Sequence, residues 1–204
     1  MNSFYSEIKK LESDYNDTYD IKKGLIPIIL TSAHGIEQKK RSGKIKFAEP
    51  YTRGIARYVS KKTSCYYLIK NEDTGIDPNK PNHDEFKTIL LNIIKQNHLK
   101  LMLDLHGASK ERDFDVEIGT LKGITADTAI VDKLVKCFRK CGVTRIAFND
   151  PFKGGYITRT TYEETKINCI QLEINQNYRS IRKANNIKKI CNSLIMFIEK
   201  LNYN

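Results

Sequence analysis

Two histidines stand at the ends of apolar segments, and each lies directly before a glycine. His34 closes the segment PIILTSAHG, and His106 closes the apolar part of LMLDLHG. A neutral imidazole at a strand end is a common metal ligand, and metal sites draw such donors from different elements of a fold. Either histidine alone fits a buried, hydrogen-bonded core residue equally well. Two at equivalent positions, each near a carboxylate, favour a metal site.

A third metal ligand has two candidates in the sequence. Glu37 lies three residues after His34, in the H-x-x-E spacing that zinc sites use. Glu49 lies directly before Pro50, at the expected start of a helix, where a carboxylate is held rigidly. Geometry slightly favours Glu49, but both stay open, because either side chain could also be a solvated glutamate or a helix cap.

The segment QLEIN places a carboxylate, Glu173, inside an apolar strand pattern. Strand alternation puts Cys169, Gln171 and Glu173 on one face and the apolar residues between them on the other. A buried carboxylate is costly unless it has a partner or a role. Beside a metal, Glu173 could act as the general base for bound water; a buried ion pair is the alternative.

Two further segments carry groups that could bind a ligand. The paired glycines 154 and 155 allow a tight backbone, and Arg159 follows them in GGYITR. An arginine can clamp a carboxylate through two parallel hydrogen bonds. Asp77-Pro78-Asn79-Lys80 forms a turn after a strand pattern.

The segments that carry these residues alternate between strand patterns and helix patterns, which indicates an α/β fold. Strand patterns cover 26–30, 65–69, 99–105, 143–148 and 167–174, and helical patterns lie near the start, after Pro50, and over 84–97, 130–141 and 187–201. Their alternation predicts helices on both faces of a mostly parallel, mixed sheet. Ligands of such sheets bind at the carboxyl ends of the strands, where both histidines stand.

Length and composition limit the class of protein. The chain has 204 residues, 40% of them hydrophobic, so we expect one domain over residues 1–204. No apolar run approaches the roughly 18 residues of a membrane span, and Met1–Lys10 does not resemble a secretory signal. Five cysteines, an odd number, indicate free thiols in a reducing, cytoplasmic setting.

The chain is strongly basic, with 35 Lys and Arg against 24 Asp and Glu and a net charge of +11. The lysines are scattered, and the densest stretch, residues 38–47, is expected to be an exposed loop. The sequence has no zinc-finger, RRM or homeodomain signature, which argues against specific nucleic-acid binding. The charge instead favours a small anionic substrate.

Taken together, the motifs resemble the N-formylglutamate amidohydrolase family, which is related in fold to the zinc carboxypeptidases and aspartoacylase. Four ordered segments carry the resemblance: PIILTSAHG, LMLDLHG, PFKGGYITR and IQLEINQNY. A fifth, IDPNK, is similar to the family's D-x-N-R turn. The resemblance implies a three-layer α/β/α sandwich of the phosphorylase/hydrolase-like, zinc exopeptidase-like type. It also implies one Zn²⁺ ion per chain.

The resemblance assigns roles residue by residue. His34 and His106 match the histidine ligands. Glu49 matches the carboxylate that opens the next helix in the family, whereas Glu37 matches the H-x-x-E of the carboxypeptidases. Glu173 matches the glutamate expected to act as base.

The resemblance also gives a substrate subsite, with two departures from the family pattern. Arg159 matches the arginine of G-G-Y-x-x-R, and Asn79 matches the asparagine of the D-x-N-R turn. Lys80 stands where the family has arginine, and Gln176 stands where an arginine often follows E-I-N. A lysine offers a point charge instead of a planar fork.

These assignments predict a zinc-dependent hydrolysis of an N-acyl amino acid. Glu173 would take the proton of metal-activated water, and Arg159, with Asn79, Lys80 and Arg112, would hold the substrate carboxylate. Asp104 would orient a metal ligand. The alternatives are a zinc peptidase acting on short peptides or cell-wall fragments, and a basic binding module without turnover.

Overall fold

The computed structural model describes the chain except residues 1–2, 16, 40–42, 44, 82 and 202–204. Its centre is a seven-stranded sheet in the order β1-β5-β2-β6-β9-β7-β8. The strands are β1 (Tyr19–Lys22), β2 (Ile26–Ser32), β5 (Cys65–Lys70), β6 (Leu101–Ala108), β7 (Val116–Gly119), β8 (Ile146–Phe148) and β9 (Asn168–Asn175). A separate hairpin pairs β3 (Gln38–Lys39) with β4 (Ile45–Lys46).

The four central strands, β5, β2, β6 and β9, run parallel to one another. The two edges reverse: β1 is antiparallel to β5, and β7 is antiparallel to β9 and carries β8 parallel to itself. Because the parallel strands end at the same edge of the sheet, the segments that follow β2, β6 and β9 lie close together.

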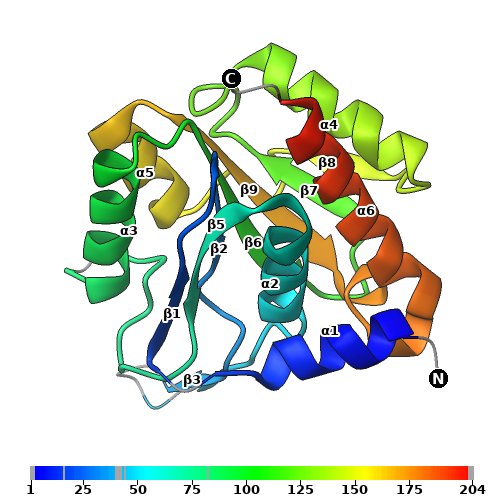
Figure 1. Cartoon of the computed structure of the whole chain (residues 1–204), viewed down its shortest axis with the longest axis horizontal. Coiled ribbons are helices and arrows are strands. Elements are labelled where there is room, and N and C mark those ends of the chain that lie inside the picture. Colours follow the sequence, from blue (N-terminus) through cyan, green and yellow to red (C-terminus); the bar gives the residue numbers. More distant parts are fainter. Residues whose placement is uncertain (1–2, 16, 40–42, 44, 82, 202–204) are drawn as a thin grey trace.

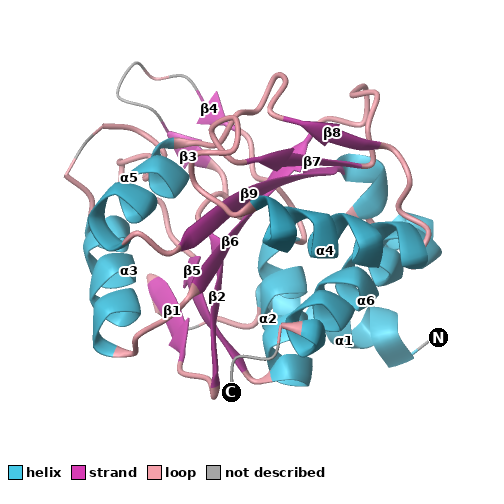
Figure 2. Cartoon of the chain, turned by 90° about the horizontal axis from the view of Figure 1, so that it is seen from above, coloured by secondary structure: helices cyan, strands magenta, loops and turns pink. Residues whose placement is uncertain are grey.

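Six helices cover the two faces of the sheet (Figures 1 and 2). They are α1 (Ser3–Ser13), α2 (Thr52–Thr63), α3 (Glu85–Gln96), α4 (Thr128–Lys140), α5 (Tyr156–Thr165) and α6 (Ala184–Lys200). Helices α1, α2, α4 and α6 pack on one face, and α3 and α5 pack on the other. The predicted α/β sandwich with a mostly parallel, mixed sheet is confirmed.

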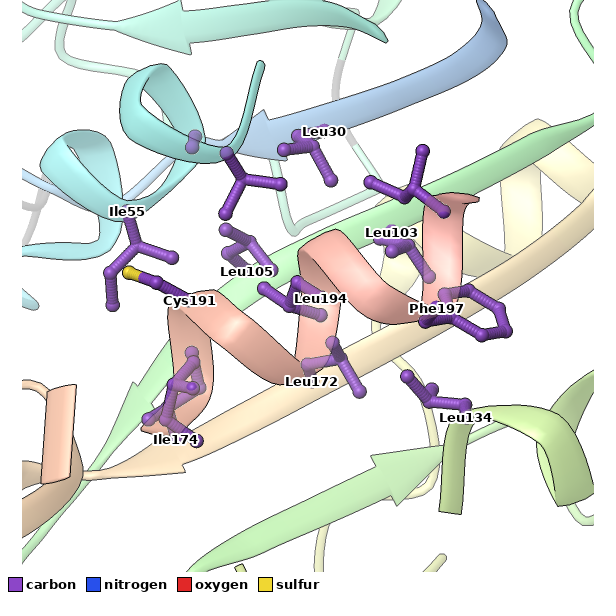
Figure 3. Packing of buried hydrophobic residues seen from close by; sticks show 14 of the residues in the cluster. Leu30, Ile55, Leu103, Leu105, Leu134, Leu172, Ile174, Cys191, Leu194 and Phe197 are labelled. Carbon is purple, nitrogen blue, oxygen red and sulfur yellow. The ribbon is translucent and has the colours of Figure 1, made fainter. Parts of the chain in front are cut away.

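Strand alternation divides the core into two clusters. Leu101, Leu103 and Leu105 of β6 join Leu172 and the α6 helix in the larger cluster (Figure 3). Met102 and Cys169 point the opposite way and pack with α3 and α5. Asp104, His106, Gln171 and Glu173 share that second direction by alternation. The apolar positions therefore form the larger core, and the polar positions between them face the smaller one.

The predicted elements are present with changed boundaries, and the structure explains two of these changes. The helix expected to start at Pro50 starts at Thr52, because Tyr51 takes a left-handed conformation with φ 69°. The strand expected over 143–148 is reduced to β8, since the Asp115 carboxylate binds the N–H groups of Thr144 and Arg145 at 3.1 and 3.0 Å. Those two N–H groups are therefore not available to a strand ladder.

The described residues contain no helix with both the length and the apolarity for crossing a bilayer. The five cysteines are free thiols, and all but Cys141 are buried. Within the basic stretch 38–47, residues 40–42 and 44 lie outside the described part. The remainder includes β3 and β4, so the loop expected there contains a short hairpin.

A carboxylate from α1 closes the start of α2. Glu12 accepts hydrogen bonds from the N–H groups of Tyr51 at 2.9 Å and Gly54 at 2.7 Å. These N–H groups have no partner within the helix, so an acceptor there stabilises the helix start. Glu12 thereby also fixes the segment that follows Glu49.

We expect Glu12→Ala to lower the free energy of unfolding by about 1–3 kcal/mol, because two helix N–H groups lose their acceptor. Urea unfolding monitored by circular dichroism measures the change. Glu7→Ala is the matched control on the same helix, since the ion pair of Glu7 among the described residues is with exposed Lys61 at 2.6 Å. Such pairs contribute about 0–1 kcal/mol. Equal losses in the two variants would contradict the capping role.

Candidate metal centre

His34 and His106 come together at the carboxyl ends of neighbouring strands. His34 follows β2, and His106 lies in β6, which pairs with β2 in parallel. Their Nδ1 atoms are 3.1 Å apart, and both side chains are buried. Glu49 completes the group: its Oε1 lies 3.4 Å from His34 Nδ1, and its Oε2 lies 3.3 Å from His106 Nδ1.

The three side chains fit a zinc ion by donor type and by spacing. Two imidazole nitrogens and a carboxylate are a common catalytic zinc set that leaves one position for water. Zinc–ligand bonds of about 2.0–2.1 Å in a tetrahedron place neighbouring donors about 3.3 Å apart. The three donor distances, 3.1, 3.3 and 3.4 Å, match this spacing. His34, Glu49 and His106 are therefore the residues that would hold the metal.

Each imidazole is oriented by a carboxylate on its other nitrogen. His106 Nε2 lies 2.9 Å from Asp104, and Asp104 accepts a hydrogen bond of 2.6 Å from Thr31. His34 Nε2 lies 2.8 Å from Asp77. These contacts turn both Nδ1 atoms toward Glu49, as in the carboxylate–histidine–zinc arrangement of metalloenzymes.

Glu49 is held by the backbone on both sides. Its N–H donates to the His34 carbonyl at 2.8 Å, and its carboxylate accepts from Gly107 N–H at 3.0 Å. Gly107 is required here, because a Cβ atom would lie 2.4 Å from the buried Arg179 guanidinium. Arg179 donates to the carbonyls of Pro50 and Ala108 at 2.9 and 3.2 Å. A buried cation thus lies directly behind the glycine.

Opposite charges shift the pKa values of this group. Burial alone would raise the pKa of Glu49, but His106 and His34 hold it well below its usual range. Burial alone would lower the pKa of His106, but Asp104 and Glu49 raise it well above its ordinary value. The cluster therefore favours a charged Glu49, the form in which a carboxylate ligates a metal.

Glu37, the other candidate ligand, lies outside this cluster and is exposed. The neighbouring Gln38 is buried and donates to the Ala33 carbonyl at 3.1 Å. Because side chains alternate along the extended chain, the burial of Gln38 turns Glu37 to solvent. The structure therefore brings Glu49 to the histidines and leaves Glu37 apart from them.

Glu173 faces the cluster from the next strand. In the parallel pairing of β6 with β9, Glu173 is in register with His106. Its side chain is buried, and Gln171 donates a 2.7 Å hydrogen bond to it. Burial raises the pKa of Glu173, while His106 lowers it and Glu49 raises it further. A carboxylate with a raised pKa is the type of group that serves as a general base near neutral pH.

A cavity of about 450 Å³ opens over these residues. Asn79 and Arg112, two of the predicted substrate-binding residues, line it together with His34, Glu49, His106 and Glu173. A larger cavity of about 630 Å³ lies at the opposite ends of β6 and β9. In the described part of the chain, no set of three metal-ligating side chains gathers there.

Arg159 and Lys80 do not line the cavity, in contrast to the expectation from the sequence. Arg159 lies on α5, whose buried residues are Ile157, Thr158 and Thr161. Helix geometry turns Arg159 away from that buried face, and its side chain is 56% exposed, with Glu163 at 4.0 Å. Lys80 is also exposed. The structure therefore does not bring Arg159 and Lys80 to the cavity wall, and the expected clamp by these two residues stays a prediction.

Several residues at the site were not singled out from the sequence. Lys46 of β4 and Lys153 line the cavity. The buried Glu117 of β7 accepts a 2.8 Å hydrogen bond from Phe152 N–H and so anchors the cavity wall. A signal for Lys46 existed, because Ile45-Lys46-Phe47 alternates in polarity as a strand does. Glu117 had a similar signal in the short segment VEIG.

Comparisons with known proteins agree with this geometry. Residues 80–179 match the family model of N-formylglutamate amidohydrolase. A search of curated proteins found no match. N-formylglutamate amidohydrolase from Ralstonia eutropha JMP134 is similar in structure, with a TM-score of 0.70 and 14% identity. The similarity covers 89% of this chain and 97% of that chain.

Two other solved structures share the fold. A bacteriophage poly-gamma-glutamate hydrolase has a TM-score of 0.58 and 14% identity, covering 92% of this chain and 91% of that one. A metallo-carboxypeptidase from Burkholderia cenocepacia has a TM-score of 0.52 and 9% identity, covering 97% and 67%. The resemblance predicted from the motifs is confirmed by the family match, and together the comparisons support a hydrolase.

We expect Glu49→Gln and His106→Ala each to abolish tight zinc binding, because each removes a ligand that no neighbour replaces. Asp104→Asn should weaken it by about 10–100-fold through loss of the orienting carboxylate. Competition with a chromogenic chelator measures these affinities. Glu37→Gln is the control and should bind zinc as the unchanged protein does. Loss of zinc in Glu37→Gln, with retention in Glu49→Gln, would reverse the assignment.

Proposed function

We propose that this protein, whose residues 80–179 resemble the N-formylglutamate amidohydrolase family, is a zinc-dependent amidohydrolase acting on a small N-acyl amino acid. One observation carries the proposal: a ligand set for zinc and a buried carboxylate face each other in one cavity. His34, Glu49 and His106 supply the ligand set, and Glu173 supplies the carboxylate. The five free thiols suit a reducing, cytoplasmic setting.

The residues of the chain divide the chemistry between them. When bound, zinc would activate a water molecule and polarise the carbonyl of the scissile amide. Glu173 takes one proton from the attacking water, whose oxygen forms a bond to the carbonyl carbon. The carbon–nitrogen bond then breaks, and Glu173 returns the proton to the leaving amine. Asp104 and Asp77 keep the two imidazoles in position throughout.

The substrate carboxylate is best placed against Arg112. Its guanidinium stacks on the Phe152 ring at 5.1 Å, which holds it at the cavity wall. Lys153 adds a second cation to the same wall. Arg112 thus takes the role expected of Arg159, because a planar guanidinium can bind a carboxylate through two hydrogen bonds.

Asn79 also lines the cavity. Its Oδ1 accepts a 3.1 Å hydrogen bond from Ile157 N–H at the start of α5. The carbonyl end of the amide is therefore engaged, and its NH₂ group can donate to a bound substrate. This contact also ties the D-P-N-K turn to the paired glycines.

A zinc peptidase acting on short peptides is the second candidate. It is favoured by the similarity in structure to the poly-gamma-glutamate hydrolase and the metallo-carboxypeptidase. A substrate panel separates the candidates: N-formyl and N-acetyl amino acids, γ-glutamyl-glutamate, and dipeptides with a free carboxyl end. Hydrolysis of the dipeptides alone would replace the amidohydrolase proposal with the peptidase.

We expect Glu173→Gln to lower kcat on the best substrate by about 10²–10⁴-fold, because it removes the proton acceptor and keeps the shape. Elemental analysis should find one zinc per chain in both proteins. Unchanged turnover by a zinc-loaded Glu173→Gln variant would contradict the assignment of Glu173 as base. A purified protein without bound zinc that binds polyanions instead would favour a non-catalytic binding module.

We expect Arg112→Met to raise KM about 10–100-fold with a smaller change in kcat, because its main loss is a charged hydrogen-bonding partner of the substrate. Arg159→Met is the matched control on α5 and should leave both constants within about twofold of the unchanged enzyme. Steady-state kinetics on the same N-acyl amino acid measure the two. The reverse result would restore Arg159 as the carboxylate clamp.

A further inference from the structure

The β3–β4 hairpin brings a lysine to the candidate metal centre. Gln38 of β3 pairs with Lys46 of β4, and both side chains lie on the inner face of the hairpin. Gln38 is buried, and Lys46 lines the cavity with His34 and Glu49. Ile45 and Phe47, which alternate with Lys46, are 52% and 78% exposed. The hairpin therefore directs one cation inward.

The Lys46 ammonium contacts the ligand set directly. Its Nζ lies 2.9 Å from His34 Nε2, 3.1 Å from His34 Nδ1 and 3.3 Å from Asp77 Oδ2. Because the distances to the two ring nitrogens are similar, the ammonium lies beside the ring and is not aligned with a single hydrogen bond. The side chain is 24% exposed, so the ammonium also reaches the open cavity. Asp77 supplies the charge that holds it there.

Two other described cations near the cluster, Arg179 and Arg112, make different contacts. Arg179 is buried, and its guanidinium donates to three backbone carbonyls, those of Ile174, Pro50 and Ala108. Arg112 stacks on Phe152 at the cavity wall, where we place the substrate carboxylate. Of the described cations that line the cavity, Lys46 is the one with contacts to a candidate ligand.

We propose that Lys46 is a catalytic residue whose ammonium donates a hydrogen bond to the carbonyl oxygen of the scissile bond as that oxygen becomes negative. The proposal rests on the proposed amide hydrolysis. When the water oxygen bonds to the carbonyl carbon, the electron pair of the C=O double bond moves to the oxygen. Lys46 keeps its proton and stabilises the negative charge on the oxygen. The electron pair re-forms the C=O double bond when the carbon–nitrogen bond breaks. Donors aimed at a developing oxyanion accelerate such steps strongly.

The test compares zinc-loaded wild type with Lys46→Met, Lys46→Arg and the control Lys39→Met, an exposed lysine on the same hairpin. Lys46→Met should lower kcat about 10²–10³-fold, with KM and zinc affinity within about threefold of wild type. Lys46→Arg should recover part of kcat because it still donates, and Lys39→Met should match wild type. Calorimetry with methylphosphonate, a tetrahedral anion, should show weaker binding to Lys46→Met only.

Three results would overturn the role of Lys46: kcat unchanged in Lys46→Met, KM raised alone, or zinc affinity lost in parallel with kcat. Methylphosphonate binding does not require turnover, so it tests the role of Lys46 separately from the proposed amidohydrolase activity. A wild type that hydrolyses nothing in the panel, yet binds methylphosphonate more tightly than Lys46→Met, overturns the amidohydrolase and supports Lys46 as the anion donor. Equal methylphosphonate binding by both proteins overturns the role of Lys46.

Discussion

The structure depends on keeping a dense group of charges buried at the carboxyl ends of three parallel strands. Asp104 and Glu173 are buried and the Glu49 side chain is only 14% exposed, and carboxylates in such surroundings would be costly without partners. His106 lies between Asp104 and Glu49, at 2.9 and 3.3 Å, so each of these carboxylates has an imidazole nitrogen as a partner. Arg179 adds a buried cation behind Gly107. Removing one member would leave its partners uncompensated and would destabilise the site.

Side chains alternate between the two faces of a strand, so the same strands can carry both the charged site and a stable apolar core. In β6 and β9 the leucines and isoleucines at alternate positions join α6 in the larger cluster (Figure 3). The positions between them carry Asp104, His106 and Glu173 toward the face of α3 and α5. A shift of register by one residue would bury the charges in the larger cluster, so the apolar pattern itself fixes which residues form the site.

The sequence predicted the site best where a functional residue lies within a local pattern that also predicts a strand. The central strands and the histidines could be predicted because a strand end followed by glycine has a local signature. The choice between Glu37 and Glu49 depended on the path of the chain after Gly35, which the burial of Gln38 determines and no spacing reveals. The position of Arg159 depended on which face α5 buries. Motif matching alone could not show that this arginine is exposed and does not line the cavity.

The candidate metal centre and the cations that line the cavity are held by different parts of the fold. Of the candidate metal ligands and the facing carboxylate, His106 and Glu173 lie on strands and His34 lies two residues after β2. Glu49 accepts a 3.0 Å hydrogen bond from the N–H group of the strand residue Gly107. Arg112, Lys153 and Lys46 lie on loops or on the short hairpin around the cavity. Residues on loops vary more readily than residues held by a sheet. The motif resemblance is accordingly strongest for the residues on strands, and the departures at Lys80 and Gln176 fall outside the strands. The candidate metal centre of such a fold can therefore be retained while the cations around it change.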